Sequence, residues 1–347
     1  MRLRHRTRIS DVDLVYHDVS RRTLAIKSTL AGKVAAAVNR QRRAPVVAFD
    51  AWRAARRDGP PSRPRERVRA VYLVVCGPRT LDDLSEVIES IHAYDDVGTR
   101  ILVVDDATGD VRWPHVRARH PEVEVVRARW PTGGPPRLSP PLALGFRTAL
   151  ERFDFDVVCK LDTDALVTGP GLTERAAAAF ADDPSLGLLG GVKTRADGQP
   201  DDYSYDRWVL EREARWSRRV RERLRRAHAG AYDGSKVHGG VYLISRRALD
   251  AMHAAGDLHR DPPWWSQIGE DLWFTLGVAA AGLRAGSWGA PGDPLASASK
   301  WLPVPLDEIQ SRGVLAAHSV RRGSDGEPES AVRAELRRQR QAYRTER

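Results

Sequence analysis

Apolar runs and helical patterns alternate along the middle of the chain. Runs typical of buried strands occupy residues 70–75, 100–104, 123–126 and 157–161. Between the first two runs, apolar residues recur at helical spacing over residues 81–91. Strands that alternate with helices predict a parallel, doubly wound α/β sheet, in which the carboxyl ends of the strands face a ligand crevice.

The pattern continues around and beyond the last of these strands. A proline pair opens a predicted helix over residues 140–150, because proline fits the first helical turn. The polar, arginine-rich stretch 205–226 predicts a helical segment, and residues 237–245 predict a strand that contains two glycines. A further helix is expected over residues 270–282, where a glycine can end it.

Charge divides the chain unevenly. Residues 1–70 contain 18 Lys and Arg against 6 Asp and Glu, whereas the other 277 residues hold 38 basic and 40 acidic side chains. The net charge of +10 therefore belongs to an N-terminal arm, in which residues 21–43 predict a helix and residues 58–64 a Gly/Pro linker. We expect three regions: a basic, partly helical arm at 1–67, a main domain at 68–322 and a peripheral tail at 323–347.

Composition narrows the class of protein. With 347 residues, 41% of them hydrophobic, the chain can bury a substantial core. No apolar run is long enough to span a bilayer, and no signal-peptide pattern follows the basic start. Cys76 and Cys159, each inside an apolar run, offer no disulfide framework. These features predict a cytoplasmic protein.

Carboxylates follow two of the predicted strands. Asp105 and Asp106 can accept hydrogen bonds from a nucleotide base or ribose, or they can merely begin a turn or cap a helix. Asp162 and Asp164 point to the same side if the chain stays extended, and two such oxygen donors suit a divalent ion that bridges a diphosphate. Asp-x-Asp occurs three times, so this copy is distinguished by the apolar segments before and after it.

Two later segments add candidate groups. Gly239 and Gly240 allow close approach of a ligand or of another backbone, although a β-bulge explains a glycine pair equally well. His318 ends an apolar, strand-like run, where an imidazole can be a third metal ligand or an ordinary structural residue.

A Gly-Glu-Asp segment opens the predicted helix at 270–282. Carboxylates at Glu270 and Asp271 suit a helix N-terminus on dipole grounds alone, or one of them can deprotonate an acceptor hydroxyl. Trp264 and Trp265 precede them, and each can offer a flat face to a sugar ring or belong to the core.

Taken in order, VYLVVCGPRT, VVDDAT, CKLDTDAL, VHGGVYLISRRAL, GEDLWF and the late His318 resemble the GT-A glycosyltransferases, especially those of the family 2 type. The KLDTD, GGVYLIS and GED segments are also similar to the β-1,3-galactosyltransferase and Fringe-like group. The resemblance spans residues 68–322 and implies a GT-A-type mixed sheet with flanking helices. The implied activity is inverting transfer of a sugar from a nucleotide-diphosphate donor, here a UDP-sugar, to an acceptor hydroxyl, with Mn²⁺ or Mg²⁺ as cofactor. Between residues 127 and 142 the chain departs from the family pattern, which leaves the donor sugar open.

The resemblance also assigns roles to single residues. The residues it implies for the metal are Asp164, Asp162 and His318, and those for the nucleotide sugar are Asp105, Asp106, Asp162, Lys160, Gly239 and Gly240. The residues it implies for the reaction and the acceptor are Asp271 as catalytic base, Glu270 as a positioning or acceptor-binding group, and Trp264 and Trp265 against the acceptor.

Two other classes of protein compete with this interpretation. A haloacid-dehalogenase-like phosphohydrolase also places Asp-x-Asp after an apolar strand, but that family usually has Gly-Thr where this chain has Ala165-Leu166. A nucleic-acid-binding protein would use the basic arm and would show salt-dependent affinity. The nearly neutral main domain argues against nucleic acid. The helix predicted at 21–43 can pack its apolar stripe on the main domain, or it can contact an anionic membrane surface or partner.

Overall fold

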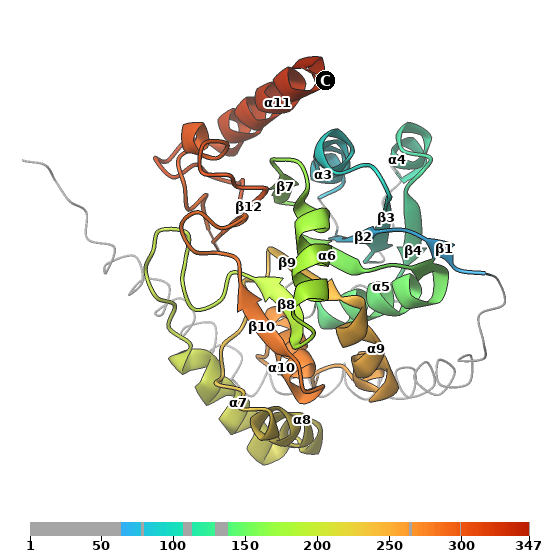
Figure 1. Cartoon of the computed structure of the whole chain (residues 1–347), viewed down its shortest axis with the longest axis vertical. Coiled ribbons are helices and arrows are strands. Elements are labelled where there is room, and N and C mark those ends of the chain that lie inside the picture. The colour runs from blue at the N-terminus through green and yellow to red at the C-terminus, as the bar shows by residue number, and fades with distance from the viewer. Residues whose placement is uncertain are drawn as a thin grey trace, which may run out of the picture. The chain divides into compact units, whose positions relative to one another are not determined.

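The computed structural model describes residues 64–77, 80–106, 113–128, 138–263, 266–298 and 300–346, and Pro60–Arg347 form one compact unit (Figure 1). The helix predicted at 21–43 lies outside the described residues. The described helices are α3 (Leu81–Tyr94), α4 (Trp113–Arg119), α5 (Ser139–Arg152), α6 (Leu172–Asp182), α7 (Ser204–Trp216), α8 (Arg218–Ala229), α9 (Arg246–Ala254), α10 (Glu270–Ala280), α11 (Glu329–Glu346) and the 3₁₀ helices η1 (Asp257–His259) and η2 (Leu306–Glu308). The described strands are β1 (Glu66–Arg67), β2 (Ala70–Cys76), β3 (Thr99–Asp105), β4 (Glu124–Arg127), β5 (Phe153–Asp154), β6 (Val157–Leu161), β7 (Ala165–Val167), β8 (Leu186–Gly190), β9 (Val241–Ser245), β10 (Arg284–Ser287), β11 (Leu295–Ser297) and β12 (Ala316–His318).

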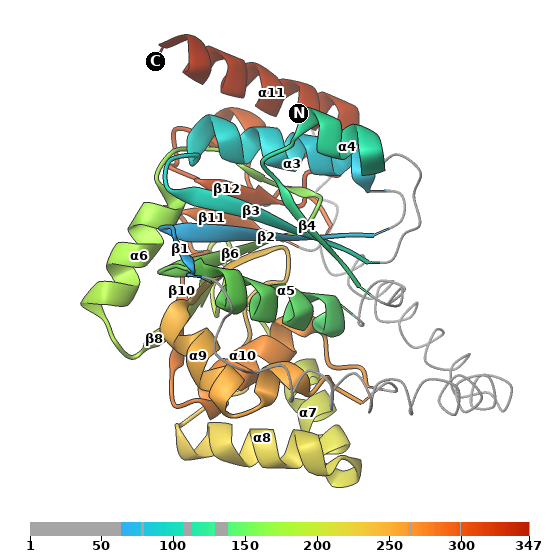
Figure 2. The same ribbon diagram turned by 90° about the vertical axis from the view of Figure 1, so that its right-hand side faces the viewer.

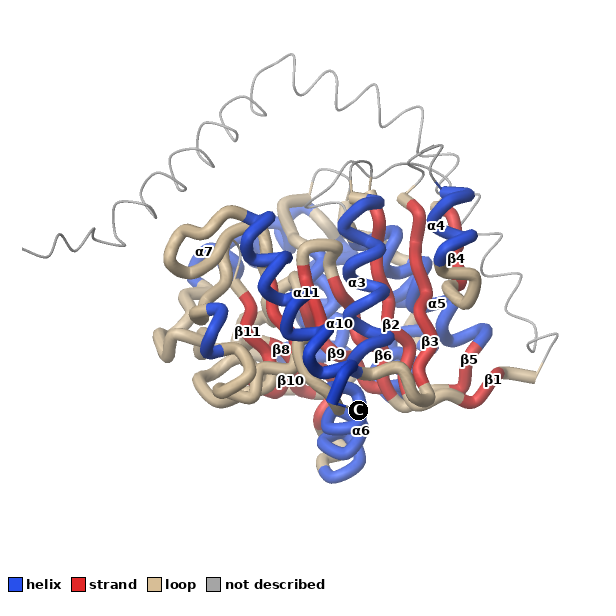
Figure 3. The backbone as a smooth tube through the Cα atoms, turned by 90° about the horizontal axis from the view of Figure 1, so that it is seen from above, coloured by secondary structure: helices blue, strands red, loops and turns tan. Residues whose placement is uncertain are grey.

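A seven-stranded sheet of order β10-β8-β9-β6-β2-β3-β4 forms the centre of this unit (Figure 3). Every neighbouring pair is parallel except the two pairs made by β9, which runs antiparallel to β6 and β8. The predicted α/β class is therefore confirmed as a mixed, mostly parallel sheet. Within the described residues, no helix is both long and apolar enough to cross a membrane.

Helices cover both faces of the sheet (Figure 2). Side chains alternate along β2, so that Tyr72 and Val74 pack in the core shared with α3, while Val71 and Leu73 pack in the core shared with α5 and α10. All seven residues of β2 are buried, as expected for a parallel strand covered on both sides. Burial on both faces explains why this strand appears as a continuous apolar run in the sequence.

Register brings the carboxyl ends of three parallel strands to one edge. Cys76 pairs with Asp105, and Val74 pairs with Leu161. Asp105 at the end of β3 and Asp162 just after β6 therefore emerge at the same edge of the sheet. Carboxyl ends of parallel strands are where ligands bind in open α/β sheets.

A second, three-stranded sheet has the order β11-β12-β7. Beside it, α11 lies along α3, held by Arg333 and Arg340, which contact Glu86 and Glu89 of α3 at 2.9 and 3.1 Å. The buried side chains of Val332 and Leu336 on α11 join the core on the α3 side of the sheet.

The structure differs from two of the expected helices and strands. The arginine-rich stretch 205–226 is two helices, because the hydroxyl of Ser217 caps α8 by accepting from Val220 N at 3.3 Å. The strand expected over 237–245 begins only at Val241, so Gly239 and Gly240 lie before the strand and not inside it. Elsewhere the predicted bounds hold to within one or two residues at most ends.

Candidate functional site

Asp162 and Asp164 are brought together by a turn. β6 ends at Leu161, and the chain turns through residues 162–164 before β7. Ala165 N donates to the carbonyl oxygen of Asp162 at 3.1 Å, and Asp162 N donates to that of Gly240 at 2.9 Å. The condition of an extended chain is therefore not met, because the first of these bonds closes a turn, while the second continues the pairing of β6 with the segment before β9.

His318 reaches this turn from a distant part of the sequence. β12 pairs antiparallel with β7, and the register places His318 opposite Ala165. As a result, His318 Nε2 lies 3.3 Å from Asp164 Oδ1. Ligand atoms of Asp162, Asp164 and His318 all lie within 4.8 Å of one another.

This donor set fits a divalent cation. Two carboxylates and an imidazole are ligands that manganese-type ions accept. The other ring nitrogen of His318, Nδ1, lies 3.4 Å from the hydroxyl of Ser297. A partner on the second nitrogen orients the ring and leaves Nε2 for a metal, as in most histidine metal sites.

Asp164 is a strongly stabilised carboxylate. Burial raises its pKa, but His318, the guanidinium of Arg321 at 2.7 Å and the hydroxyl of Ser319 at 3.1 Å together hold that pKa well below its usual range. The carboxylate is therefore ionised near neutral pH, as a metal ligand must be.

The glycine pair makes room for two side chains. A Cβ at Gly240 would lie 2.0 Å from Cγ and Nδ1 of His318, and a Cβ at Gly239 would lie 2.6 Å from Oε1 of Glu270. Neither glycine is part of a strand bulge. The absence of a side chain at Gly240 is what lets the His318 ring lie against the backbone, whereas at Gly239 the close neighbour is the end of the Glu270 side chain.

Lys160 connects the two groups of carboxylates. Its side chain is fully buried, and Nζ donates to Asp162 Oδ1 at 2.6 Å and to the carbonyl oxygen of Gly239, with Glu270 Oε1 at 3.6 Å. Burial lowers the pKa of Lys160, yet Asp162 and Glu270 raise it more, so the net shift is upward. The ammonium faces these protein groups, which differs from the direct nucleotide-sugar contact predicted for it.

Glu270 is the first residue of α10 and is almost completely buried. Burial raises the pKa of its carboxyl to about 7, with Lys160 acting in the opposite direction and Asp271 and Asp162 adding to the rise. A carboxyl with this pKa changes protonation near neutral pH, as an acid or base in a catalytic site does.

Asp271 is held in place by Lys236. Lys236 Nζ lies 2.8 Å from Asp271 Oδ2 and 3.4 Å from Asp206 Oδ1, and the backbone N of Leu272 donates to Asp271 Oδ1 at 2.8 Å. Burial raises the pKa of Asp206. No local pattern marks Lys236 or Asp206 as members of the site, because their contacts join segments about thirty or more residues apart.

A buried glutamate fixes the loop before Glu270. Glu213 on α7 has no exposed surface and accepts from Gln267 N at 2.7 Å and from the Ser266 hydroxyl at 2.6 Å. Arg212 donates to the Gln267 side chain at 2.7 Å. Trp264 and Trp265, predicted to contact the acceptor, lie in this loop but outside the described residues.

Asp105 and Asp106 are both buried at the carboxyl end of β3. Asp106 N donates to the carbonyl oxygen of Cys76 at 3.0 Å, which ties this end of β3 to β2. Asp105 Oδ2 lies 3.5 Å from Arg127 Nε. Because β2 separates β3 from β6, these carboxylates stand beside the Asp162 turn and are not part of its metal-ligand group.

Comparisons with known proteins give a fold likeness only. No protein-family model and no curated protein matches the chain. Among solved structures, a mannosyltransferase PcManGT from Pyrobaculum calidifontis in complex with GDP-Man and Mn²⁺ is 19% identical, with a TM-score of 0.39, over 73% of this chain and 65% of that chain. S. aureus TarS 1–349 is 14% identical, with a TM-score of 0.41, over 64% of this chain and 58% of that chain. The same TarS fragment in complex with UDP-GlcNAc is 14% identical, with a TM-score of 0.41, over 64% of this chain and 56% of that chain. The chain spans less than two thirds of the length of each, and with similarities this low the case for a function depends on the site.

Proposed function

We propose that this protein is a GT-A-type glycosyltransferase that moves a sugar from a nucleotide diphosphate to an acceptor hydroxyl with inversion at C1. The observation that carries the proposal is the meeting of Asp162, Asp164 and His318 within 4.8 Å at the carboxyl edge of the sheet, next to Glu270 and Asp271. The order of motifs over residues 68–322, which resembles that of GT-A enzymes, supports it independently.

Asp164, Asp162 and His318 would hold the divalent cation, Mn²⁺ or Mg²⁺. When bound, the cation neutralises charge that develops on the diphosphate leaving group. Arg321, at 2.7 Å from Asp164, adds a second positive charge at the same place. Lys160 is a positioning residue in this scheme, because its buried ammonium fixes Asp162 against the Gly239 carbonyl.

Asp271 is the proposed general base. As the acceptor oxygen bonds to C1 of the sugar, the bond from C1 to the diphosphate oxygen breaks, and the hydroxyl proton passes to the Asp271 carboxylate. Lys236 and the Leu272 amide each hold one carboxylate oxygen, and each oxygen keeps a lone pair for the proton. Attack from the face opposite the leaving group gives inversion in one displacement.

The remaining site residues have proposed roles around this centre. Asp105 and Asp106 contact the base and ribose from the end of β3, and Gly239 and Gly240 line the donor sugar. Glu270 positions Lys160 and the acceptor, and Trp264 and Trp265 contact the acceptor. We propose a UDP-sugar as donor, a cytoplasmic location, and contact of the basic arm at 1–67 with an anionic membrane surface, without nucleic acid as partner.

Calorimetric titration of UDP, GDP, dTDP and CDP tests the proposal. We expect one nucleotide to bind in the presence of Mn²⁺ and to bind at least about tenfold more weakly, or ~1.4 kcal/mol, without metal and in Asp164→Asn. Asp156→Asn is the matched control, because Asp156 belongs to another Asp-x-Asp segment and pairs with Arg67 at 2.8 Å at the surface. Metal binding alone would not report on the Asp164 site, because His92, His120 and Glu122 form a second group of possible metal ligands. Nucleotide binding is therefore the readout.

Two results would contradict the proposal. The first is binding that is equally tight without metal and in Asp164→Asn. The second is the absence of binding by all four nucleotides, and phosphate release from a phosphomonoester would then favour the phosphohydrolase alternative.

A further inference from the structure

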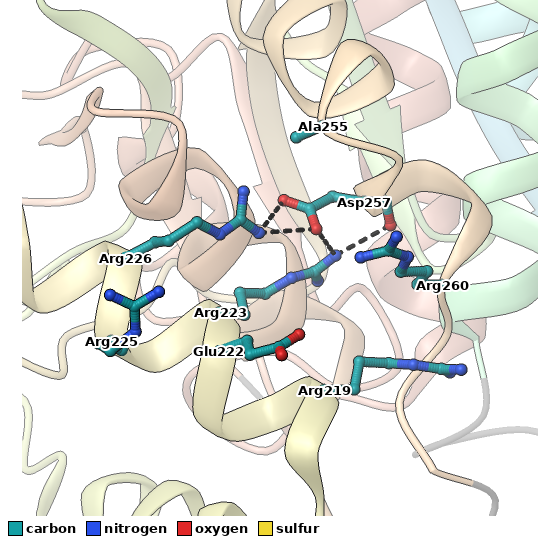
Figure 4. Close-up of a pocket in the computed structure, with 8 residues that line it drawn as sticks. All are labelled: Arg219, Glu222, Arg223, Arg225, Arg226, Ala255, Asp257 and Arg260. Carbon is teal, nitrogen blue, oxygen red and sulfur yellow. Dashed lines mark hydrogen bonds and ion pairs between the residues drawn. The ribbon is translucent and has the colours of Figure 1, made fainter.

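A basic pocket lies on α8, away from the residues assigned above. It has a volume of about 230 Å³ and opens between α8 and the segment around η1 (Figure 4). Its charged lining consists of five arginines and two acids: Arg219, Arg223, Arg225, Arg226 and Arg260, with Glu222 and Asp257. The lining therefore carries three more positive than negative charges.

Both acids in the lining already have cationic partners. Asp257 accepts from Arg226 at 2.7 Å and from Arg223 at 3.0 Å, so one carboxylate serves two guanidinium groups. Glu222 pairs at 2.6 Å with Arg218, which lies outside the pocket. The excess positive charge is consequently left to the other arginines.

Three arginines of the lining form no ion pair with a carboxylate. In the described part of the chain, the side chains of Arg225 and Arg260 form no ion pair, and Arg219 donates only to the backbone oxygen of Asp261. Burial lowers the pKa of Arg219, the nearby Asp261 carboxylate raises it, and the charge of Arg260 lowers it again. Glu222 attracts Arg225 and Arg260 without an ion pair, and Asp261 attracts Arg219. The like charges of the lining still repel each other, so holding these groups together has a free-energy cost that a further anion would reduce.

Arg223 provides a buried donor in the same pocket. Its side chain is 1% exposed, and its Nε forms no hydrogen bond within the described structure. Burial lowers the pKa of Arg223 to about 10, with Arg226 and Arg219 adding to the decrease. An unsatisfied buried N–H costs about 1–3 kcal/mol, a cost that a ligand or ordered water at this site would offset.

We propose that this pocket binds a phosphate group. Planar guanidinium forks match phosphate oxygens through paired hydrogen bonds, and several arginines around one concavity are typical of phosphate recognition. A phosphomonoester carries about −1.5 to −2 charges at pH 7, comparable to the excess positive charge of the lining. The phosphate belongs either to a soluble molecule or to a lipid headgroup.

Residues of the pocket contact both ends of the segment that leads to α10. Arg223 stacks on the Trp273 ring at 3.5 Å, in the first turn of α10, and donates to the Asp257 carbonyl oxygen at 2.9 Å. Arg219 holds the Asp261 carbonyl, and Arg260 is the preceding residue. A phosphate between α8 and Arg260 would therefore fix the start of that segment.

Titration of inorganic phosphate into the metal-free, full-length protein tests the proposal. Binding is measured by calorimetry and by the shift in Tm. The test variant is Arg225→Ala with Arg260→Ala. The matched control is Arg221→Ala with Arg338→Ala, which removes two exposed arginines that do not line the pocket, Arg221 being on α8 itself. We expect phosphate affinity to fall at least about tenfold in the test variant and to remain within about twofold in the control.

Vesicles distinguish the two sources of phosphate. The same three proteins are sedimented with phosphatidylcholine vesicles that do or do not contain phosphatidic acid. Binding to phosphatidic acid that the test variant loses and the control keeps assigns a lipid headgroup, whereas pocket-dependent binding of free phosphate alone assigns a soluble ligand. The proposal is overturned if neither binding depends on Arg225 and Arg260. Because no metal or nucleotide is present, this result is independent of the proposed transferase activity.

Discussion

The carboxyl groups of Asp164 and Glu270 lie in the same site, but their surroundings shift their pKa values in opposite directions. Asp164 is surrounded by His318, Arg321 and Ser319, and its pKa lies well below the usual range. Glu270 is buried with Lys160 as its cationic neighbour, and its pKa is raised to about 7. The contrast shows that neighbours, not residue type, divide the acids into a fixed charge that suits a metal and a carboxyl that can exchange a proton.

Each of the adjacent glycines lies against a side chain of a different carboxylate group. Gly240 makes room for the His318 ring, and Gly239 makes room for the Glu270 carboxylate. Lys160 is the link between them, at 2.6 Å from Asp162 and 3.6 Å from Glu270. If the two groups have separate tasks, substitutions in one should leave the task of the other measurable.

The largest effect is expected for Asp271→Asn. Loss of a general base typically costs about 10²–10⁴-fold in rate, so we expect kcat to fall about 10³-fold while metal-dependent nucleotide binding remains within about twofold. Steady-state kinetics and calorimetry measure the two quantities. Asp164→Asn should lose both, and a comparable loss of nucleotide binding in Asp271→Asn would remove the separation of tasks.

The next effect is expected for Gly240→Ala. The new Cβ would overlap the His318 ring, which is held between β12 and the turn, so the ring must shift away from Asp164. We expect the affinity for the nucleotide in the presence of metal to fall about tenfold or more. Gly239→Ala is the matched control, because its Cβ meets only the end of the Glu270 side chain. Equal losses in both variants would show that the glycines have no separate roles.

A smaller effect is expected in the pH dependence of stability. The pKa of Glu270 rises from 4.5 to about 7 on folding, so the unfolded chain releases the proton first and the native state is favoured at low pH. The free energy of unfolding should decrease, on the order of 1–3 kcal/mol, as the pH rises from about 4.5 to 7. Glu270→Gln should lack this slope in metal-free urea denaturation. An unchanged slope in the variant would assign the titration to another group.

The smallest effect is expected for Glu213→Gln. The amide oxygen can still accept one of the two bonds from Gln267 N and the Ser266 hydroxyl, but the charge is lost. We expect a loss of about 1 kcal/mol in unfolding free energy and a KM for acceptor raised about threefold, with nucleotide affinity unchanged. Glu211→Gln, an exposed glutamate on the same helix, is the control. A change in nucleotide affinity would show that this loop also supports the Asp164 group.

The fold was predictable where local pattern and tertiary contacts agree. The strands β2, β3 and β6 are buried on both faces and therefore appear in the sequence as apolar runs. The break between α7 and α8 was not predictable from glycine or proline, since Ser217 sits within a continuous helical pattern and caps the second helix by its hydroxyl. Val237 and His238 continue the apolar alternation before β9, but they pair with no strand.

The three residues of the possible metal-ligand group were predictable from the sequence, but the connections of the site were not. Asp162, Asp164 and His318 follow apolar strands, a local signal that the sequence carries. The pairing of Asp271 with Lys236 depends on contacts between distant segments, which no single-sequence pattern encodes. Glu213 did leave a signal, because it stands one helical turn from Val209 on the apolar face of α7, where a lone acid requires buried donors.

The glycine pair also limits how this site can change over evolution or in the laboratory. Enzymes are often retuned for new substrates by exchanging small residues beside the bound ligand for larger ones. Here both small residues are already filled by the protein's own side chains, with prospective contacts of 2.0 and 2.6 Å. Variation in substrate preference must therefore arise elsewhere, and position 240 should tolerate far fewer exchanges than position 239 in a randomised library.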